Sequence, residues 1–161
     1  NAALARQVQE LQRYRSDFFG RLRDLLKDRK DIRVVGDRFV FESEVLFPSG
    51  SATLAPEGLA AMDQLASAIA DLERQIPKEI DWALQVDGHT DIRPINSPAF
   101  PSNWELSTAR AASVVKYMVA KGVPAKRLVA AGYGEFQPIE AGTDEISLQK
   151  NRRIELKLTN R

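Results

Sequence analysis

The 161-residue sequence contains no cysteine, a single histidine and no long apolar run. The missing cysteines exclude disulfides, thiolate metal sites and cysteine nucleophiles. No apolar stretch approaches the roughly 18 residues of a membrane-spanning helix, and no signal-peptide core is visible. With 23 Lys and Arg against 22 Asp and Glu, the net charge is +1, so a general attraction to nucleic acid or to an anionic membrane has little support. The length fits one ordinary domain.

Residues 1–30 have the pattern of a long helix. They contain no proline, and apolar side chains recur at alternating steps of four and three. This spacing gives one apolar face, interrupted by Arg15, as in a short heptad stretch. The pattern fits either a helix packed on its own domain or a self-associating helix or stalk that forms a homodimer. The face consists of Leu4, Val8, Leu11, Phe18, Leu22 and Leu25.

Residues 31–161 are expected to form one domain of mixed strands and helices. "DIRVVGDRFVFESEVLF" alternates like a β-hairpin, an amphipathic helix begins at Pro56, and "EIDWALQVDG" reads as a strand that ends at Gly88. After a proline-bearing loop, the capping-box spacing in "SNWE" starts a third helix that stops near Gly122. "RLVAAGYG" and "RRIELKL" are the last strands, with a loop or short helical turn between them. The order predicts an α+β fold, a two-layer sandwich of a mixed β-sheet packed by helices.

The stretch "VDGHTD" places Asp87 and Asp91 around His89, the one histidine. One imidazole and two carboxylates make a poor ligand set for a transition metal. No serine stands in a nucleophile-elbow context, and no second general acid or base is placed beside His89. "GYG" lacks the spacing of a dinucleotide-binding fingerprint. We therefore predict no metal, no cofactor and no enzymatic activity.

Arg110 is the informative residue, because it falls in the apolar stripe of the third helix together with Leu106, Val114 and Tyr117. A charge in such a stripe is costly unless an anion or hydrogen-bond acceptors replace its lost water. One partner is internal, an Arg110–Asp91 ion pair of purely structural value. The other is a ligand carboxylate held by Arg110, with Asp91 holding a nearby ligand ammonium. A paired acid and base in one pocket suit a zwitterion such as an amino acid.

Six motifs occur in the order and approximate spacing of the OmpA-like peptidoglycan-binding domain, which roughly residues 38–158 resemble. They are "FPSGSATL", "DGHTD", "NWELSTARA", "GVPAKRL", "GYGEFQPI" and "NRRIEL". The long loop before "SNWELS" looks most like the MotB type, the peptidoglycan-anchoring half of ion-driven stator units. The resemblance implies no catalysis and binding of the diaminopimelate of the peptide stem. It implies that Asp91 holds the ligand ammonium and Arg110 its carboxylate, although the loop between them is several residues longer than in shorter versions.

The resemblance suggests further candidates around this pair. "NRRIEL" is expected to bring Arg152 or Arg153 near the pocket rim, unless these are solvated charges at a strand end. His89 is expected mainly to shape the turn that presents the aspartate. Asn103 is expected to fix the loop or to touch the ligand, and Trp104 to pack rather than serve as a platform for a sugar. The predicted ligand-binding residues are Thr90, Asp91, Asn103, Leu106, Arg110 and Arg153.

The sequence as a whole predicts a non-catalytic domain that anchors a MotB-like membrane protein to peptidoglycan in the periplasm of a Gram-negative bacterium. Since the chain begins at Asn1 rather than at methionine, we expect an upstream segment to tether it to the inner membrane, beside a MotA-like partner. The runner-up is an outer-membrane or lipoprotein-anchored OmpA-like domain. The alternative of a different class is a structural or dimerisation module in which Asp91 and Arg110 form only a buried bridge.

Overall fold

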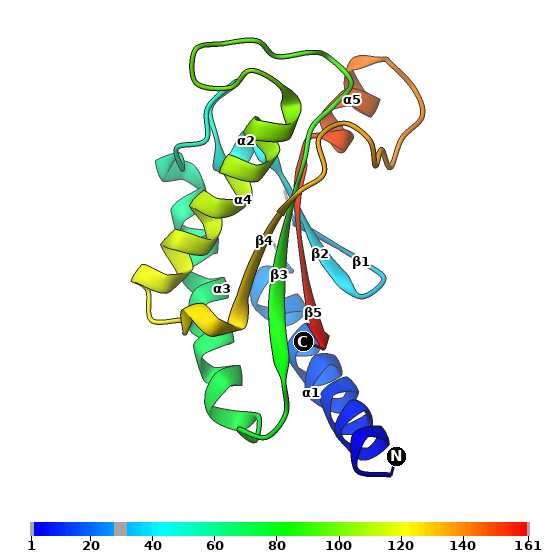
Figure 1. Ribbon diagram of the computed structural model, residues 1–161, viewed down its shortest axis with the longest axis vertical. Helices are drawn as coiled ribbons and strands as arrows, with labels where there is room; N and C mark the ends of the chain where they lie inside the picture. Colours follow the sequence, from blue (N-terminus) through cyan, green and yellow to red (C-terminus); the bar gives the residue numbers. More distant parts are fainter. Residues whose placement is uncertain (1, 28–31, 161) are drawn as a thin grey trace.

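The computed structural model describes residues 2–27 and 32–160, in which helices cover one face of a five-stranded sheet (Figure 1). The strands lie in the order β1-β2-β5-β3-β4. The β3–β4 pair is parallel, and the other neighbouring pairs are antiparallel. This architecture confirms the predicted α+β class with a mixed sheet. The strands are β1 Ile32–Val35, β2 Arg38–Glu42, β3 Trp82–His89, β4 Leu128–Gly132 and β5 Arg153–Asn160.

In the described part of the chain, the long helix α1 precedes the sheet, and two further long helices and two short ones lie between its strands. The long helices begin and end close to the predicted positions, and Pro56 is the first residue of its helix, as expected. The four-residue helix α2 was not predicted, because so short a segment shows no helical period in the sequence. The helices are α1 Ala2–Leu26, α2 Ser43–Leu46, α3 Pro56–Gln75, α4 Asn103–Ala120 and α5 Glu145–Asn151, with a 3-10 turn at Ala125–Arg127.

Strand alternation divides the sheet into an apolar face and a polar face. On β3, Trp82, Leu84 and Val86 point into the core beneath the helices and are at most 1% exposed. Apart from Ala83, the residues between these on β3 and those that alternate with the apolar residues of β5 are polar, and Asp87 lies opposite Glu155 in the ladder between the strands. The apolar face therefore carries the core, and the polar face remains available for charged groups.

Helix α1 packs on its own domain, against α3 and β5. Leu11, Phe18 and Leu22 of the predicted apolar face are buried in the common core. Leu4 is 59% exposed, which agrees with the extension of the first turns of α1 beyond the sheet in Figure 1. The side chain of Leu25 lies outside the described residues. A homodimer through this face stays a prediction, and it would have to form without withdrawing the three buried side chains from the core.

Two glycines bring α4 directly against the sheet. A Cβ atom on Gly88 of β3 would lie 2.1 Å from the carbonyl oxygen of Ser107, and one on Gly132 of β4 would lie 2.1 Å from Oγ1 of Thr108. Only hydrogen fits at these two positions. The contact fixes the first half of α4 beside the ends of β3 and β4, where the "GHTD" residues leave the sheet.

Candidate functional site

A cavity of about 490 Å³ lies where β3 ends. Residues 90–102 form the long loop that arches over this end of the molecule in Figure 1, and the cavity lies between this loop, α2, α4 and α5. Six charged side chains line it, three carboxylates and three guanidinium groups, so that their formal charges cancel. They are Glu44, Asp91, Glu145, Arg93, Arg110 and Arg152.

Asp91 is buried at the inner end of this cavity, with 5% of its surface exposed. Its Oδ2 accepts hydrogen bonds from Nη1 of Arg152 at 2.6 Å and from Nη2 of Arg93 at 2.8 Å. Its Oδ1 accepts one from the backbone amide of Arg93 at 2.9 Å. Burial alone would raise the pKa of Asp91, but the hydrogen bonds from Arg93 and Arg152 hold this pKa below its usual value. Asp91 is therefore a carboxylate at neutral pH.

Arg110 projects from α4 into the same cavity and is also 5% exposed. Its Nε donates to the carbonyl oxygen of Ser51 at 2.8 Å and its Nη2 to that of Pro48 at 3.3 Å. The guanidinium carbon lies 5.1 Å from the ring centroid of Phe47. Burial and the nearby charge of Arg152 lower the pKa of Arg110 to about 10, so that it stays charged at neutral pH.

Asp91 and Arg110 share the cavity without pairing with each other. The ion pairs of Asp91 go to Arg93 and Arg152, and none joins Asp91 to Arg110 within the described part of the chain. The alternative prediction of a direct Asp91–Arg110 bridge is therefore not what the structure shows. The difference arises because Arg93, two residues beyond the aspartate, and Arg152, just before β5, supply the cations that Asp91 binds.

Thr90, Asn103 and Leu106 all line the cavity, as predicted for residues near the ligand. The amide nitrogen of Asn103 donates to the carbonyl oxygen of Arg93 at 3.0 Å and to a carboxylate oxygen of Glu135 at 3.3 Å. These hydrogen bonds fix the long loop to α4, which is one of the two roles expected for Asn103. The hydroxyl of Thr90 donates to the backbone carbonyl of Asp91 at 2.9 Å, so that Thr90 holds the turn that presents the aspartate.

Arg153 does not line this cavity, whereas its neighbour Arg152 does. Adjacent residues at the start of a strand point to opposite sides of the sheet. The guanidinium of Arg153 therefore lies on the polar face, where it pairs with Glu155 and donates to the backbone carbonyl of Gln137. Of the two alternatives in "NRRIEL", the structure places Arg152 at the pocket. Glu44 and Glu145 were not predicted as site residues from the sequence, because they lie far from "GHTD" in the chain and belong to no motif.

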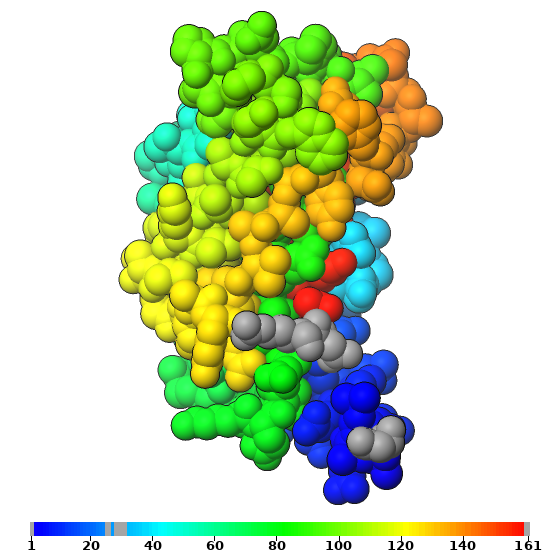
Figure 2. Space-filling view, in the orientation of Figure 1, coloured from blue at the N-terminus to red at the C-terminus, as the bar shows by residue number. Residues whose placement is uncertain are grey.

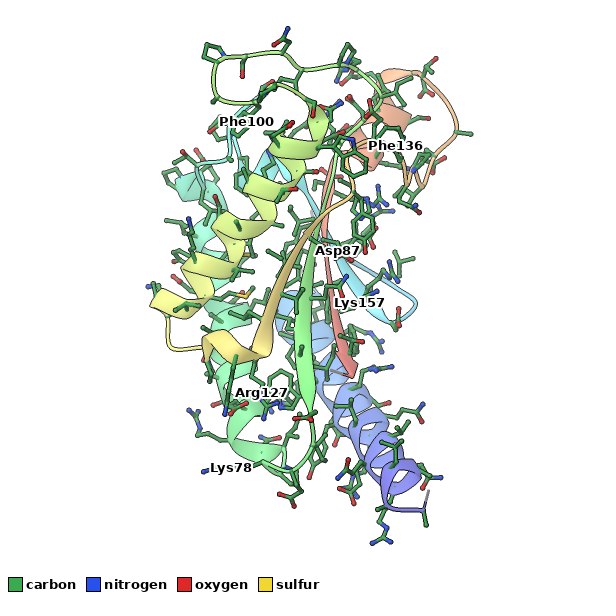
Figure 3. The ribbon with its side chains drawn as sticks, in the orientation of Figure 1. Lys78, Asp87, Phe100, Arg127, Phe136 and Lys157 are labelled. Atoms are coloured by element: carbon green, nitrogen blue, oxygen red, sulfur yellow. The ribbon has the colours of Figure 1, made fainter. Side chains whose placement is uncertain are left out.

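His89 lies on the polar face, together with Asp87 and Glu155, and Asp91 does not join them. Figure 3 shows Asp87 and Lys157 on the side of the sheet that faces away from α3 and α4. The ring of His89 stacks on Tyr133 with centroids 4.9 Å apart, and both ring nitrogens are buried without a hydrogen-bond partner among residues 2–27 and 32–160. Arg38 and Arg153 already hold the Glu155 carboxylate. A cation at this cluster would meet two guanidinium groups, which disfavours metal binding.

The buried His89 predicts a loss of stability in mild acid. Burial, together with the charge of Arg153, lowers the pKa of His89 to about 4 from an ordinary value near 6.5. Between these two pKa values His89 binds a proton in the unfolded chain but not in the folded chain, so the free energy of unfolding falls as the pH drops from 6.5 toward 4. We expect the free energy of unfolding to decrease by about 1 kcal/mol from pH 7 to pH 5.5.

Urea unfolding at the two pH values measures this effect. His89→Gln is the control, because His89 is the only histidine in the chain, and the variant should lose most of the pH dependence. An equally steep dependence in the variant would show that another group is responsible.

Comparison with known proteins identifies the family of this cavity-bearing fold. Residues 46–152 match the OmpA family. The chain belongs to the OmpA family. Outer membrane protein A of Escherichia fergusonii is 40% identical over 129 residues, which cover 74% of this chain and 49% of that protein. This OmpA-family chain thus spans about half the length of the curated relatives that it matches.

Two solved structures resemble the OmpA-family chain over most of its length. The crystal structure of a MotB-like protein from Desulfovibrio vulgaris is 28% identical, with a TM-score of 0.75, and the match covers 95% of this chain and 98% of that one. The cell wall anchor of the T6SS from Pseudomonas aeruginosa is 29% identical, with a TM-score of 0.70, and the match covers 88% and 96%. The expected resemblance to OmpA-like and MotB-like domains is confirmed. In residues 2–27 and 32–160, no helix has both the length and the apolar character needed to cross a bilayer.

Proposed function

We propose that this domain binds peptidoglycan without cleaving it, by holding the diaminopimelate of the peptide stem in the cavity at the end of β3. The observation that carries the proposal is the placement of a buried cation and a buried anion, Arg110 and Asp91, in one cavity without an ion pair between them. A cavity with three positive and three negative groups has no preference for a simple anion or cation. It suits a ligand that carries both charges.

Arg110 has donor capacity left for the ligand carboxylate. Its Nε and Nη2 are bonded to backbone carbonyls, whereas no hydrogen bond engages Nη1 within the described residues. A carboxylate at Nη1 would restore the hydration that burial removes from the guanidinium group. The two backbone carbonyls already orient the guanidinium group of Arg110, so ligand binding does not have to include the entropy cost of ordering it.

Asp91 receives the ligand ammonium by exchange with Arg93. Among the residues that the structure describes, only the backbone amide of Arg93 donates a hydrogen bond to Oδ1 of Asp91, and a carboxylate oxygen can accept two. The Arg93 side chain, which bonds Oδ2, is 53% exposed, so it can swing into solvent when an ammonium group arrives. Arg152 is mostly buried and remains on Oδ2. One half-exposed arginine thus shields the aspartate until a ligand replaces it.

Two muropeptides that differ at one residue of the peptide stem test this proposal. A soluble muropeptide with diaminopimelate should bind about tenfold more tightly than one with lysine at that position, because lysine lacks the second carboxylate and its charge-assisted hydrogen bond. Isothermal titration calorimetry of both ligands measures the ratio. Equal affinities would refute the role of Arg110 as a carboxylate receptor.

The proposal extends to the cellular setting. By its likeness to MotB-like domains and to a cell wall anchor, we place the domain in the periplasm, where it fastens a membrane protein to the wall. An inner-membrane tether and a MotA-like partner belong to this proposal, as does the alternative of an outer-membrane anchor. Sequencing upstream of Asn1 separates these anchors, because an apolar span that contains an aspartate is expected for an ion-coupled stator.

A further inference from the structure

We propose that Trp104 and Phe136 form a platform on which the glycan strand of peptidoglycan rests while its peptide stem occupies the cavity. This inference rests on the proposed function and adds a second ligand class, a neutral acetylated sugar, to the same molecule. Trp104 was expected from the sequence to pack rather than to serve as a platform for a sugar. The structure instead stacks it on Phe136 at the surface, with ring centroids 5.0 Å apart and an interplanar angle of 27°.

The exposure of the two rings is unusual within this chain. Trp104 is 51% exposed and Phe136 57% exposed, whereas Trp82 and five other phenylalanines are buried. Figure 3 shows Phe136 beside the N-terminal end of α4, and Figure 2 shows that end of the helix and the loop after β4 in contact on one surface. Aromatic rings provide large apolar contact area at low cost in side-chain entropy. Exposed aromatic residues are therefore enriched at binding surfaces.

Both rings of the platform pack against the backbone of one glycine. Gly134 has a φ of +61°, and a Cβ there would lie 3.3 Å from the ring of Phe136 and 3.6 Å from that of Trp104. The amide of Gly134 donates to the hydroxyl of Ser107 on α4 at 3.0 Å. The ring of Trp104 from α4 and the ring of Phe136 from the loop after β4 thus pack on the same backbone position, which is itself bonded to α4, and little ordering is needed when a ligand stacks on them.

Hydrogen bonds also connect the platform to the cavity. The backbone amide of Thr90, which lines the cavity, donates to the carbonyl oxygen of Gly134 at 2.9 Å. Asn103 lines the cavity and precedes Trp104, and its amide reaches the carboxylate of Glu135, which precedes Phe136. The wall of the cavity is therefore joined directly to the two segments that carry the rings.

The groups around the rings favour a sugar over other occupants. A pyranose offers an apolar C–H face for the rings and hydroxyl and acetamido groups for polar neighbours. Glu135 directly precedes Phe136, and Ser102 and Glu105, which are hydrogen-bonded to each other, lie within two residues of Trp104, so the segments that carry the rings also carry oxygen acceptors. The carboxylates among them would repel an anionic lipid surface. Since the stem in the cavity is covalently attached to glycan, the sugar is also present at high local concentration.

Two matched ligands test the inference. One is the free stem peptide with diaminopimelate, and the other is the same peptide attached to an N-acetylglucosamine–N-acetylmuramic acid disaccharide. We expect the disaccharide to strengthen binding about tenfold in the wild-type chain. Trp104→Ala and Phe136→Ala should remove this gain without changing the affinity for the free peptide, whereas Trp104→Phe should keep most of it. Val119→Ala is the control, because Val119 is another exposed apolar residue, near the far end of α4.

A third ligand separates this inference from the proposed function. An N-acetylglucosamine oligosaccharide without peptide should shift the fluorescence of Trp104, since the other tryptophan is fully buried. If neither peptide ligand binds but the oligosaccharide shift persists and requires Trp104, the cavity assignment fails and the platform stands. If the disaccharide does not raise the affinity of the wild-type chain, the platform assignment fails. It also fails if Trp104→Ala leaves both affinities unchanged and alters only the oligomeric mass measured by light scattering.

Discussion

Arg110→Ala is expected to abolish sedimentation of the chain with insoluble peptidoglycan while leaving it folded. The change removes the donor proposed for the ligand carboxylate and leaves that carboxylate unpaired in the cavity, so binding should weaken about 100-fold, more than when the carboxylate itself is absent. Stability should fall by no more than about 2 kcal/mol, because Arg110 bonds only backbone carbonyls and leaves no carboxylate unpaired.

Arg127→Ala is the matched control for this variant. Arg127 is likewise a buried arginine that bonds backbone carbonyls, and it lies over Trp82 near the lower end of the molecule in Figure 3. It also pairs with Glu73. We expect Arg127→Ala to cost at least as much stability as Arg110→Ala and yet to retain peptidoglycan binding. Co-sedimentation and urea unfolding of both variants decide the matter, and equal loss of binding in both would show that the effect comes from the fold.

Asp91→Asn tests the anionic residue of the proposed site in the same two assays. It should also lose binding, and its stability shows how much Asp91 contributes to the cluster of arginines around it. If Asp91 and Arg110 were a structural pair, each single change would cost about 3 to 5 kcal/mol and the double variant would recover much of that loss. We expect the two losses to add, because Asp91 pairs with Arg93 and Arg152 instead. Sedimentation of both single variants with the wall would overturn the site.

Gly88→Ala is expected to lower the free energy of unfolding by about 3 kcal/mol or more. The added methyl group would lie 2.1 Å from the carbonyl oxygen of Ser107 and 2.9 Å from its carbonyl carbon, so that α4 must move off the sheet. A backbone contact of this kind cannot relax by a change of rotamer. Since α4 carries Arg110 and Leu106, the same movement should weaken ligand binding.

Gly20→Ala provides the opposite control. Gly20 lies within α1, and nothing is found within 4 Å of the position that its Cβ would occupy. Alanine there should stabilise the chain by about 0.5 to 1 kcal/mol, because glycine is a poor helix former. Chemical denaturation of both variants measures the contrast. A Gly88→Ala variant as stable as the wild type would mean that α4 and β3 are not in the close contact described.

The sequence by itself determined the elements and the family of this protein. Apolar periodicity distinguishes helices from strands because the two structures bring every third or fourth residue, or every second residue, to one face. That rule placed α3, α4 and β3 and predicted an α+β sandwich. The motifs around Asp91 and Arg110 added the family resemblance, and its place in an apolar helical stripe made Arg110 a candidate ligand-binding residue on energetic grounds.

Only the tertiary structure decided which charges meet. Arg152 and Arg153 are adjacent in sequence, and no local pattern says which one turns toward Asp91, because that depends on the side of the sheet that each residue faces. Glu44, Glu145 and Arg152 reach one cavity from distant parts of the chain through the pairing of β2, β5 and β3. The exposure of Trp104 was likewise invisible in the sequence, since a glycine thirty residues later in the chain, Gly134, lies beneath its ring and keeps it at the surface. Periodicity specifies the face of an element, whereas the partners on that face depend on how the chain folds back on itself.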